Sequence, residues 1–197
     1  MTVSITSTTL SNLESFFESL PAQAEKAMAL AINQVAGRDG LALIKRDMRE
    51  DIEFPAGYLE GSRLNVVRKA GPGSLEAVIR ARDRATSLAR FAPGQRPGNT
   101  RGRRVQLKVA PGSTRVLKSA FLVSLKNGNT GLAVRLKPGD TMRHSQASMK
   151  LANNLYLLYG PSVEQVFSGV AEDRSGDIAE MVSKQFLRQF VRFMGNG

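Results

Sequence analysis

The first fifty residues repeat apolar side chains at the spacing of an amphipathic helix. Ser11 and Glu14 have the spacing of a capping box, which predicts that a short helix begins there. Residues 22–52 predict a longer helical region whose apolar side chains pack in the core. Gly37 and Gly40 interrupt this region; because each costs about 1 kcal/mol relative to alanine, the pair predicts a bend or a close approach of a neighbouring backbone. The apolar stripes are Leu13, Phe16, Phe17 and Leu20 in the first helix, and Met28, Ile32, Val35, Ile44, Met48 and Ile52 in the second.

The apolar period shortens to two between residues 63 and 82, which is typical of strands. Residues 63–70 and 74–82 are two strand candidates, and Gly71-Pro72-Gly73 between them predicts a hairpin turn. Arginines stand among the apolar residues of both segments. This is expected where one face of a sheet packs and the other meets water.

The clearest strand signal is SAFLVSLKNGNTGLAVR at residues 119–135. Apolar residues alternate on both sides of Asn127-Gly128, which predicts a β-hairpin because Gly and Asn tolerate the positive φ of a tight turn. The following Asn129-Thr130-Gly131 equally allows a longer or bulged loop. Further strands are predicted at 105–109 and 151–159, and a hairpin needs such neighbours for stability.

A basic segment rich in glycine and proline, FAPGQRPGNTRGRR at residues 91–104, precedes these strands. It has no periodic apolar pattern and cannot bury enough apolar surface to order itself in isolation. We therefore predict a basic loop or arm over about 91–104.

The chain ends in amphipathic helices. Ser162 with Gln165, and Asp177 with Glu180, have capping-box spacing and predict two helix starts. An isolated helix of this kind could lie on a membrane, but the strands need covering, so its aromatic stripe is predicted to pack on the sheet and in part against a neighbouring subunit. The stripe is Phe186, Phe190 and Phe193, and the other face carries Lys184, Arg188 and Arg192.

Together these segments predict an α+β fold, in which N-terminal helices and a C-terminal amphipathic helix pack on a mainly antiparallel sheet. A chain of 197 residues is long enough to form one domain with a sizeable core, so residues 1–197 are predicted to be a single domain with the basic arm. No apolar run is long enough to span a bilayer, and the N-terminus lacks the pattern of a signal peptide. We therefore expect no membrane partner and an origin in the cytoplasm.

Positive charge is concentrated in the middle of the chain. The chain has 28 Lys and Arg against 17 Asp and Glu, a net charge of +11. Residues 82–150 contain 15 of the basic residues and only two acids, Asp83 and Asp140. A block of one sign meets nucleic acid or an acidic protein surface, or stays solvated. Charge alone does not choose among these.

Residues that commonly carry catalysis are scarce. The chain has no cysteine, and the lone His144 cannot build a metal site of the usual type. The glycines do not form a phosphate-binding loop. We therefore predict no enzyme activity and no catalytic, cofactor-binding or metal-binding residues. A cluster of acids interleaved with basic residues at i,i+4 spacing predicts a solvated or interfacial helix face. These acids are Asp39, Asp47, Glu50, Asp51 and Glu53.

The hairpin at 119–135, with its AF and LKNG phrases, resembles the minor tail protein Z family of lambda-like tailed phages. AMALAINQVAGR at 27–38, YGPSVEQVF at 159–167 and the closing amphipathic helix also fit, so the resemblance spans about residues 27–194. Members of the family carry a densely basic middle before the hairpin, and this chain has a more diluted set. The shared phrases are structural rather than catalytic.

The resemblance implies a structural tail completion protein in the virion, assembled in the host cytoplasm. Such a protein acts at the head-proximal end of the tail as a homo-oligomeric ring, sixfold to match the tail, and helps to join tail to head. The expected partners are other tail and head–tail joining proteins, with non-specific contact to genomic DNA in the lumen. The alternative, from charge, is a freestanding nucleic-acid-binding protein, although the sequence has no recognisable reading module. The residues expected to face a partner or DNA are Arg96, Arg101, Arg103, Arg104 and Lys108.

Overall fold

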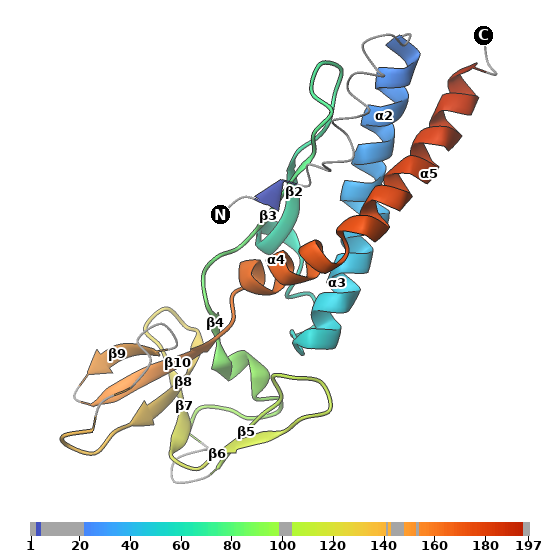
Figure 1. The fold of residues 1–197 in the computed structure, drawn as a ribbon. Helices are drawn as coiled ribbons and strands as arrows, with labels where there is room; N and C mark the ends of the chain where they lie inside the picture. Colours follow the sequence, from blue (N-terminus) through green and yellow to red (C-terminus); the bar gives the residue numbers. More distant parts are fainter. Residues whose placement is uncertain are drawn as a thin grey trace. The chain divides into compact units, whose positions relative to one another are not determined.

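The computed structural model describes residues 3–4, 22–98, 104–140, 142, 148–152 and 154–194. Its helices and antiparallel sheets confirm the predicted α+β fold (Figure 1). The chain forms two compact units: residues 1–48, 59–82 and 164–197 make the first, and residues 49–58 and 83–163 make the second. Organisation as a single domain therefore stays a prediction. The helix predicted from Ser11, and the residues Arg101, Arg103 and His144, lie outside the described residues.

Most of the first unit is helical. Its helices are α2 (Ala22–Gln34), α3 (Gly40–Asp51), α4 (Val163–Asp173) and α5 (Ser175–Met194). We expected α5 to pack on the sheet; its most extensive partner is α2, and the C-terminal end of α5 lies beside the start of α2 (Figure 1). The reason is that α2 buries residues over an arc broader than a single core-facing stripe. The buried residues are Ala24, Ala27, Met28, Ala29, Ala31 and Ile32.

A π-helical segment, η2 (Val35–Asp39), joins α2 to α3 at the two glycines. The N–H of Gly40 donates to the carbonyl of Val35, which is the i to i+5 pattern of a π-helix. A Cβ at Gly40 would lie 2.8 Å from Cγ1 of Val35 and 2.9 Å from its carbonyl oxygen. The predicted close approach is therefore present, but within the helix rather than with a neighbouring element.

Replacing Gly40 with alanine is expected to destabilise the protein by about 1–3 kcal/mol, because the new methyl group meets backbone that cannot move without disrupting the π-helical segment. Gly37 is a matched control, since nothing lies within 4 Å of a Cβ there. Gly37→Ala should stabilise the protein by about 0.5–1 kcal/mol, as glycine-to-alanine changes in helices usually do. Urea unfolding of both variants measures the difference. Equal stability of the two would contradict the close approach at Gly40.

The hairpin predicted at 63–82 forms in the first unit. β2 (Leu64–Arg68) follows the short 3-10 turn η3 (Gly61–Arg63) and pairs antiparallel with β3 (Val78–Ala81). β1 (Val3–Ser4) pairs with the other edge of β3. The side-chain amide of Asn33 on α2 donates to the carbonyl of Ala70 and accepts from its N–H, both at 2.8 Å. This paired contact fixes the hairpin against the helix.

The second unit is built on a five-stranded antiparallel sheet. Its order is β4 (Thr86–Ser87), β10 (Leu155–Gly160), β8 (Thr130–Arg135) and β7 (Ala120–Ser124), and β9 (Ser148–Ala152) also pairs with β10. β7 and β8 are the hairpin predicted at 119–135, which the structure confirms. The longer of the two expected loops forms, because the N–H of Leu125 donates to the carbonyl of Asn129 at 2.8 Å. Gly128 has the expected positive φ, at 76°.

The single strand predicted at 151–159 is wrong, because two strands, β9 and β10, form an antiparallel pair over 148–160. Asn154 lies just before β10 with a left-handed φ of 57°. Asparagine adopts this conformation more readily than most residues because its short side chain can hydrogen-bond locally. The pattern over 151–159 concealed this reversal of the chain.

A short hairpin and a 3-10 turn complete the second unit: β5 (Val105–Leu107), β6 (Arg115–Leu117) and η4 (Leu88–Phe91). Phe91 is 2% exposed, and its carbonyl accepts from the N–H of Lys108 at 2.8 Å. The predicted arm therefore begins too early, because Phe91 and Ala92 belong to the core. The core cluster consists of Ala92, Val105, Leu107, Ala120, Leu122 and Leu132.

Candidate functional site

The second unit carries a group of exposed cations, which we call the exposed basic set. Residues 83–163 contain 14 Lys and Arg against two acids, Asp83 and Asp140. All of the basic residues that the structure describes in this range are exposed. The set comprises Arg84, Arg90, Arg96, Arg104, Lys108, Arg115, Lys118, Lys126, Arg135, Lys137 and Lys150.

Strand alternation explains this exposure around β5. Val105 and Leu107 are buried in the core cluster, whereas Gln106 and the flanking Arg104 and Lys108 are exposed. Successive side chains of a strand point to opposite faces, so apolar residues at alternate positions place the basic ones in water. The sequence pattern that builds the core therefore also builds the exposed basic set.

Of the five predicted site residues, two flank β5 and a third follows a residue that donates a hydrogen bond to it. Arg104 and Lys108 flank this strand, and Arg96 follows Gln95, whose Nε2 donates to the carbonyl of Gln106 at 2.8 Å. All three are exposed, as predicted. The other two, Arg101 and Arg103, lie outside the described residues. Arg115, which pairs with Leu107 across the β5–β6 hairpin, belongs to the same region and was missed because no periodic pattern marks β6.

Charge is unevenly divided between the two units. The second unit contains 15 Lys and Arg against five Asp and Glu, a net charge of +10, whereas the first contains 13 against 12. Within the part of the chain that the structure describes, no member of the exposed basic set forms an ion pair. Cations left without carboxylate partners repel each other and attract anions. The second unit is therefore suited to an anionic partner.

Arg90 is the one member of the exposed basic set with a defined aromatic partner. Its guanidinium carbon lies 5.1 Å from the ring centre of Tyr58, within cation–π range. The Tyr58 ring stacks on Phe54 at 5.6 Å, and its hydroxyl donates to Oγ1 of Thr86 at 3.4 Å. Because Tyr58 is 32 residues earlier in the chain, no local spacing could have predicted this contact.

The aromatic stripe of α5 is half-buried. Phe186 and Phe190 stack with ring centres 5.5 Å apart, and Phe193 lies one turn further along the helix. Their predicted role in oligomer or sheet packing stays a prediction; the partner that the structure gives α5 is mainly α2.

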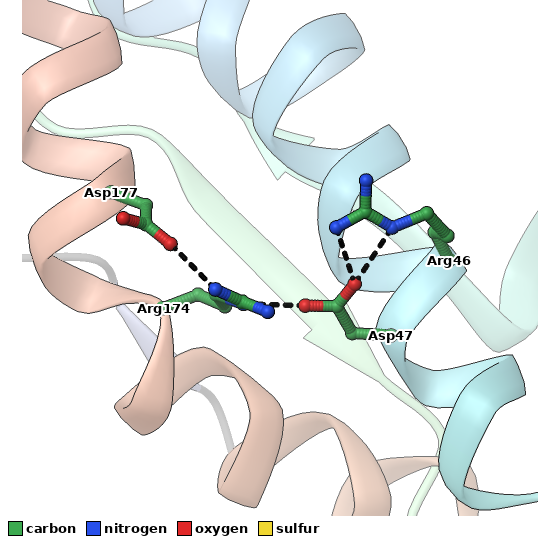
Figure 2. A network of polar contacts seen from close by, with 4 residues as sticks. All are labelled: Arg46, Asp47, Arg174 and Asp177. Carbon is green, nitrogen blue, oxygen red and sulfur yellow. Dashed lines mark hydrogen bonds and ion pairs between the residues drawn. The ribbon is translucent and has the colours of Figure 1, made fainter.

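Figure 2 shows a polar network in the first unit that sequence reasoning missed. The carboxylate of Asp47 accepts from Nε of Arg46 at 2.9 Å and from Nε of Arg174 at 2.5 Å. Arg174 also donates to Asp177 at 2.9 Å. Of the two expected faces, solvated and interfacial, Asp47 lies on the interfacial one: it is buried on α3 because its partner comes from 127 residues away. Asp177 is not a helix cap, since α5 begins two residues earlier at Ser175.

The network holds fixed charges. Burial alone would raise the pKa of Asp47, but hydrogen bonds and charge from Arg174 and Arg46 outweigh it and hold the pKa below its usual value. Hydrogen bonds to Asp47 and Asp177 raise the pKa of Arg174. A general base needs a pKa near the working pH. Asp47 therefore acts as a structural anion that joins α3 to the α4–α5 junction.

Among the described residues, no three His, Cys, Asp or Glu side chains gather in a way that could hold a metal ion. No helix in the described part of the chain is both long and apolar enough to cross a membrane. The prediction that the protein is not an enzyme stays a prediction.

Comparison with known proteins finds no matching family model, and no curated protein or solved structure matches the chain significantly. The resemblance to minor tail proteins therefore rests on the residues that carry it.

Proposed function

We propose that the protein is a structural component of a phage tail, which forms a ring at the head-proximal end and helps to join tail to head. The resemblance over residues 27–194 supports the class of protein. The observation that supports its mode of action is the exposed basic set, whose members have no ion-pair partner among the described residues. A ring subunit acts through surfaces, and the unit that carries this set has a net charge of +10.

Two anionic partners are available to such a surface in a tail. Carboxylates on a neighbouring ring would accept charge-assisted, bidentate hydrogen bonds from arginine. Phosphates of DNA in the lumen would attract the same cations without any reading of base sequence. We favour the protein carboxylates, because permanent strong phosphate contacts would retard the passage of DNA.

The second candidate is a freestanding nucleic-acid-binding protein, which the same exposed cations favour. Proteins that bind single strands also stack bases on exposed aromatic rings. Phe54, Tyr58 and Phe91, the rings that lie near Arg90, are buried. The exposed basic set therefore lacks this stacking platform around Arg90.

A salt titration tests the proposal against the second candidate. We expect the full-length protein to bind a short DNA duplex only non-specifically, with Kd of about 10⁻⁴–10⁻⁶ M at physiological salt. Fluorescence anisotropy with two unrelated duplexes, between about 50 and 200 mM salt, measures both affinity and sequence preference. Tight binding at the higher salt, or a clear preference for one duplex, would contradict the tail proposal and support the second candidate.

A further inference from the structure

The loop between β7 and β8 contains an asparagine that is followed by a glycine. Asn127, Gly128 and Asn129 are all exposed, and Asn127 is the one asparagine among the described residues that precedes a glycine. Gly128 has a φ of 76°, and nothing lies within 4 Å of the position that a Cβ would take there. Because glycine has no Cβ, its backbone nitrogen is open to close approach by the preceding side chain.

The side chain of Asn127 folds back over the peptide that follows it. Its Oδ1 accepts from the backbone N–H of Asn129 at 3.1 Å. This hydrogen bond closes a ring of atoms that contains both Cγ of Asn127 and the backbone nitrogen of Gly128. A nucleophile and an electrophile held within one small ring react more readily, because they have little freedom left to lose.

The same hydrogen bond reaches the atom on which charge develops in such a reaction. When a nitrogen attacks an amide carbon, negative charge builds up on the carbonyl oxygen, and a fixed N–H donor stabilises it. The N–H of Asn129 already donates to this oxygen of Asn127.

One contact opposes the attack. The N–H of Gly128 donates to the carbonyl of Leu125 at 2.9 Å, and this bond must open before the nitrogen can react. Both residues of the turn around it, Asn127 and Gly128, are exposed, so water can replace the lost partner. Opening a single hydrogen bond of this kind slows the reaction by about tenfold at most.

We propose that Asn127 is a modification site, at which the chain deamidates without an enzyme. The backbone nitrogen of Gly128 loses its proton to hydroxide and bonds to Cγ of Asn127, while the bond from Cγ to Nδ2 breaks and the amide nitrogen leaves as ammonia. One water molecule then opens the resulting succinimide at either of its two carbonyls. The product is aspartate or isoaspartate, so the reaction consumes water, releases ammonia and involves no oxidation or reduction.

The modification changes both the charge and the backbone of the hairpin tip. It places a carboxylate directly after Lys126, in the more basic of the two units, and lowers the net charge of the chain by one. The isoaspartate form also adds one carbon atom to the backbone of the loop that is closed by the N–H of Leu125 and the carbonyl of Asn129. The inference is independent of the proposed tail function.

Peptide mapping by tandem mass spectrometry tests the proposal in the full chain, after incubation near neutral pH and in mild alkali. Trypsin cuts after lysine and arginine and releases residues 127–135 as one peptide, so Asn129, which precedes Thr130, is an internal control. We expect Asn127 to deamidate at least about tenfold faster than Asn129, because the branched Thr130 crowds the corresponding nitrogen. The rate at Asn127 should rise in alkali, where the attacking nitrogen loses its proton more readily. Equal rates at the two asparagines would overturn the proposal.

Two comparisons test the turn and the attacking nitrogen separately. A synthetic peptide of residues 122–132 gives the rate without the fold, and we expect the folded chain to react no more than about tenfold more slowly. A folded chain that stayed unmodified while the peptide reacted would show that the turn protects Asn127 and would overturn the proposal. Gly128→Ala should slow the reaction at least about tenfold in both chain and peptide, because the new Cβ crowds the nitrogen. An unchanged rate in this variant would indicate direct hydrolysis of the amide and exclude attack by the backbone.

Discussion

Replacing Arg101, Arg103 and Arg104 together with alanine is expected to block the joining of tails to filled heads while leaving the subunit folded. Arg104 is exposed, and exposed charges contribute only about 0–1 kcal/mol each to stability. The change removes three positive charges from the segment that precedes β5, whichever anion they meet. The titre of infectious particles measures joining, and circular dichroism of the purified variant measures folding.

A charge-matched control comes from the first unit. Lys26, Lys69 and Arg80 are exposed, and their joint replacement with alanine changes the net charge by the same amount. We expect a normal titre from this control. A normal titre from the variant of 101, 103 and 104 would exclude both a carboxylate and a phosphate partner for these arginines. Equal loss from both variants would indicate that net charge, rather than position, matters.

The elements that the sequence predicted well are those whose determinants are local. The hairpin at 119–135 follows from alternation on both sides of Asn127-Gly128, and α4 begins at Val163, directly after the predicted cap Ser162. Each of these predictions depends on residues within a few positions of one another, so tertiary packing did not change the local structure that they favour. The hairpin of β9 and β10 was missed because the apolar pattern over 151–159 reads as one strand and conceals the reversal of the chain before β10.

Which elements pack against each other was harder to predict than which elements form. The periodicity of α5 predicts an amphipathic helix but does not say which element it covers. The answer depends on α2, which buries residues over a broad arc and so accepts α5 as a partner. In the same way, the apolar residues of the predicted arm gave no pattern, yet Phe91 packs against Phe54 with ring centres 6.1 Å apart. Isolated apolar residues in loops are placed by long-range contacts that a window of sequence does not contain.

The same distinction between local and long-range determinants applies to the candidate site. Exposure of Arg96, Arg104 and Lys108 follows from composition and from alternation around β5, and the structure agrees. The contacts of Arg90 with Tyr58 and of Asp47 with Arg174 depend on residues 32 and 127 positions apart, and sequence patterning predicted neither. The exposure of charged side chains can thus be predicted from the sequence pattern. The long-range partners of charged side chains depend on the fold.

Asp47→Ala is expected to destabilise the protein by about 1–3 kcal/mol at neutral pH. The carboxylate accepts hydrogen bonds from both Arg46 and Arg174, so its removal takes one acceptor from each guanidinium group at a partly buried site, while Arg174 keeps its bond to Asp177. Asp47→Asn is the matched control, because it keeps the shape and one acceptor oxygen but removes the charge, and we expect a smaller loss. Urea unfolding of the three proteins measures the differences.

The pH dependence of these differences identifies the charge as their source. The pKa of Asp47 is lower in the folded protein than its ordinary value of 3.8, through its hydrogen bonds to Arg174 and Arg46, which outweigh burial. A carboxyl group with a depressed folded pKa stabilises the fold fully above its unfolded pKa, and this contribution is lost as the pH falls through the folded pKa. The stability advantage of the wild type over Asp47→Asn should therefore be constant near neutral pH and should shrink below about pH 4. An advantage that persisted unchanged in acid would show that packing, rather than the ionised carboxylate, holds α3 to the α4–α5 junction.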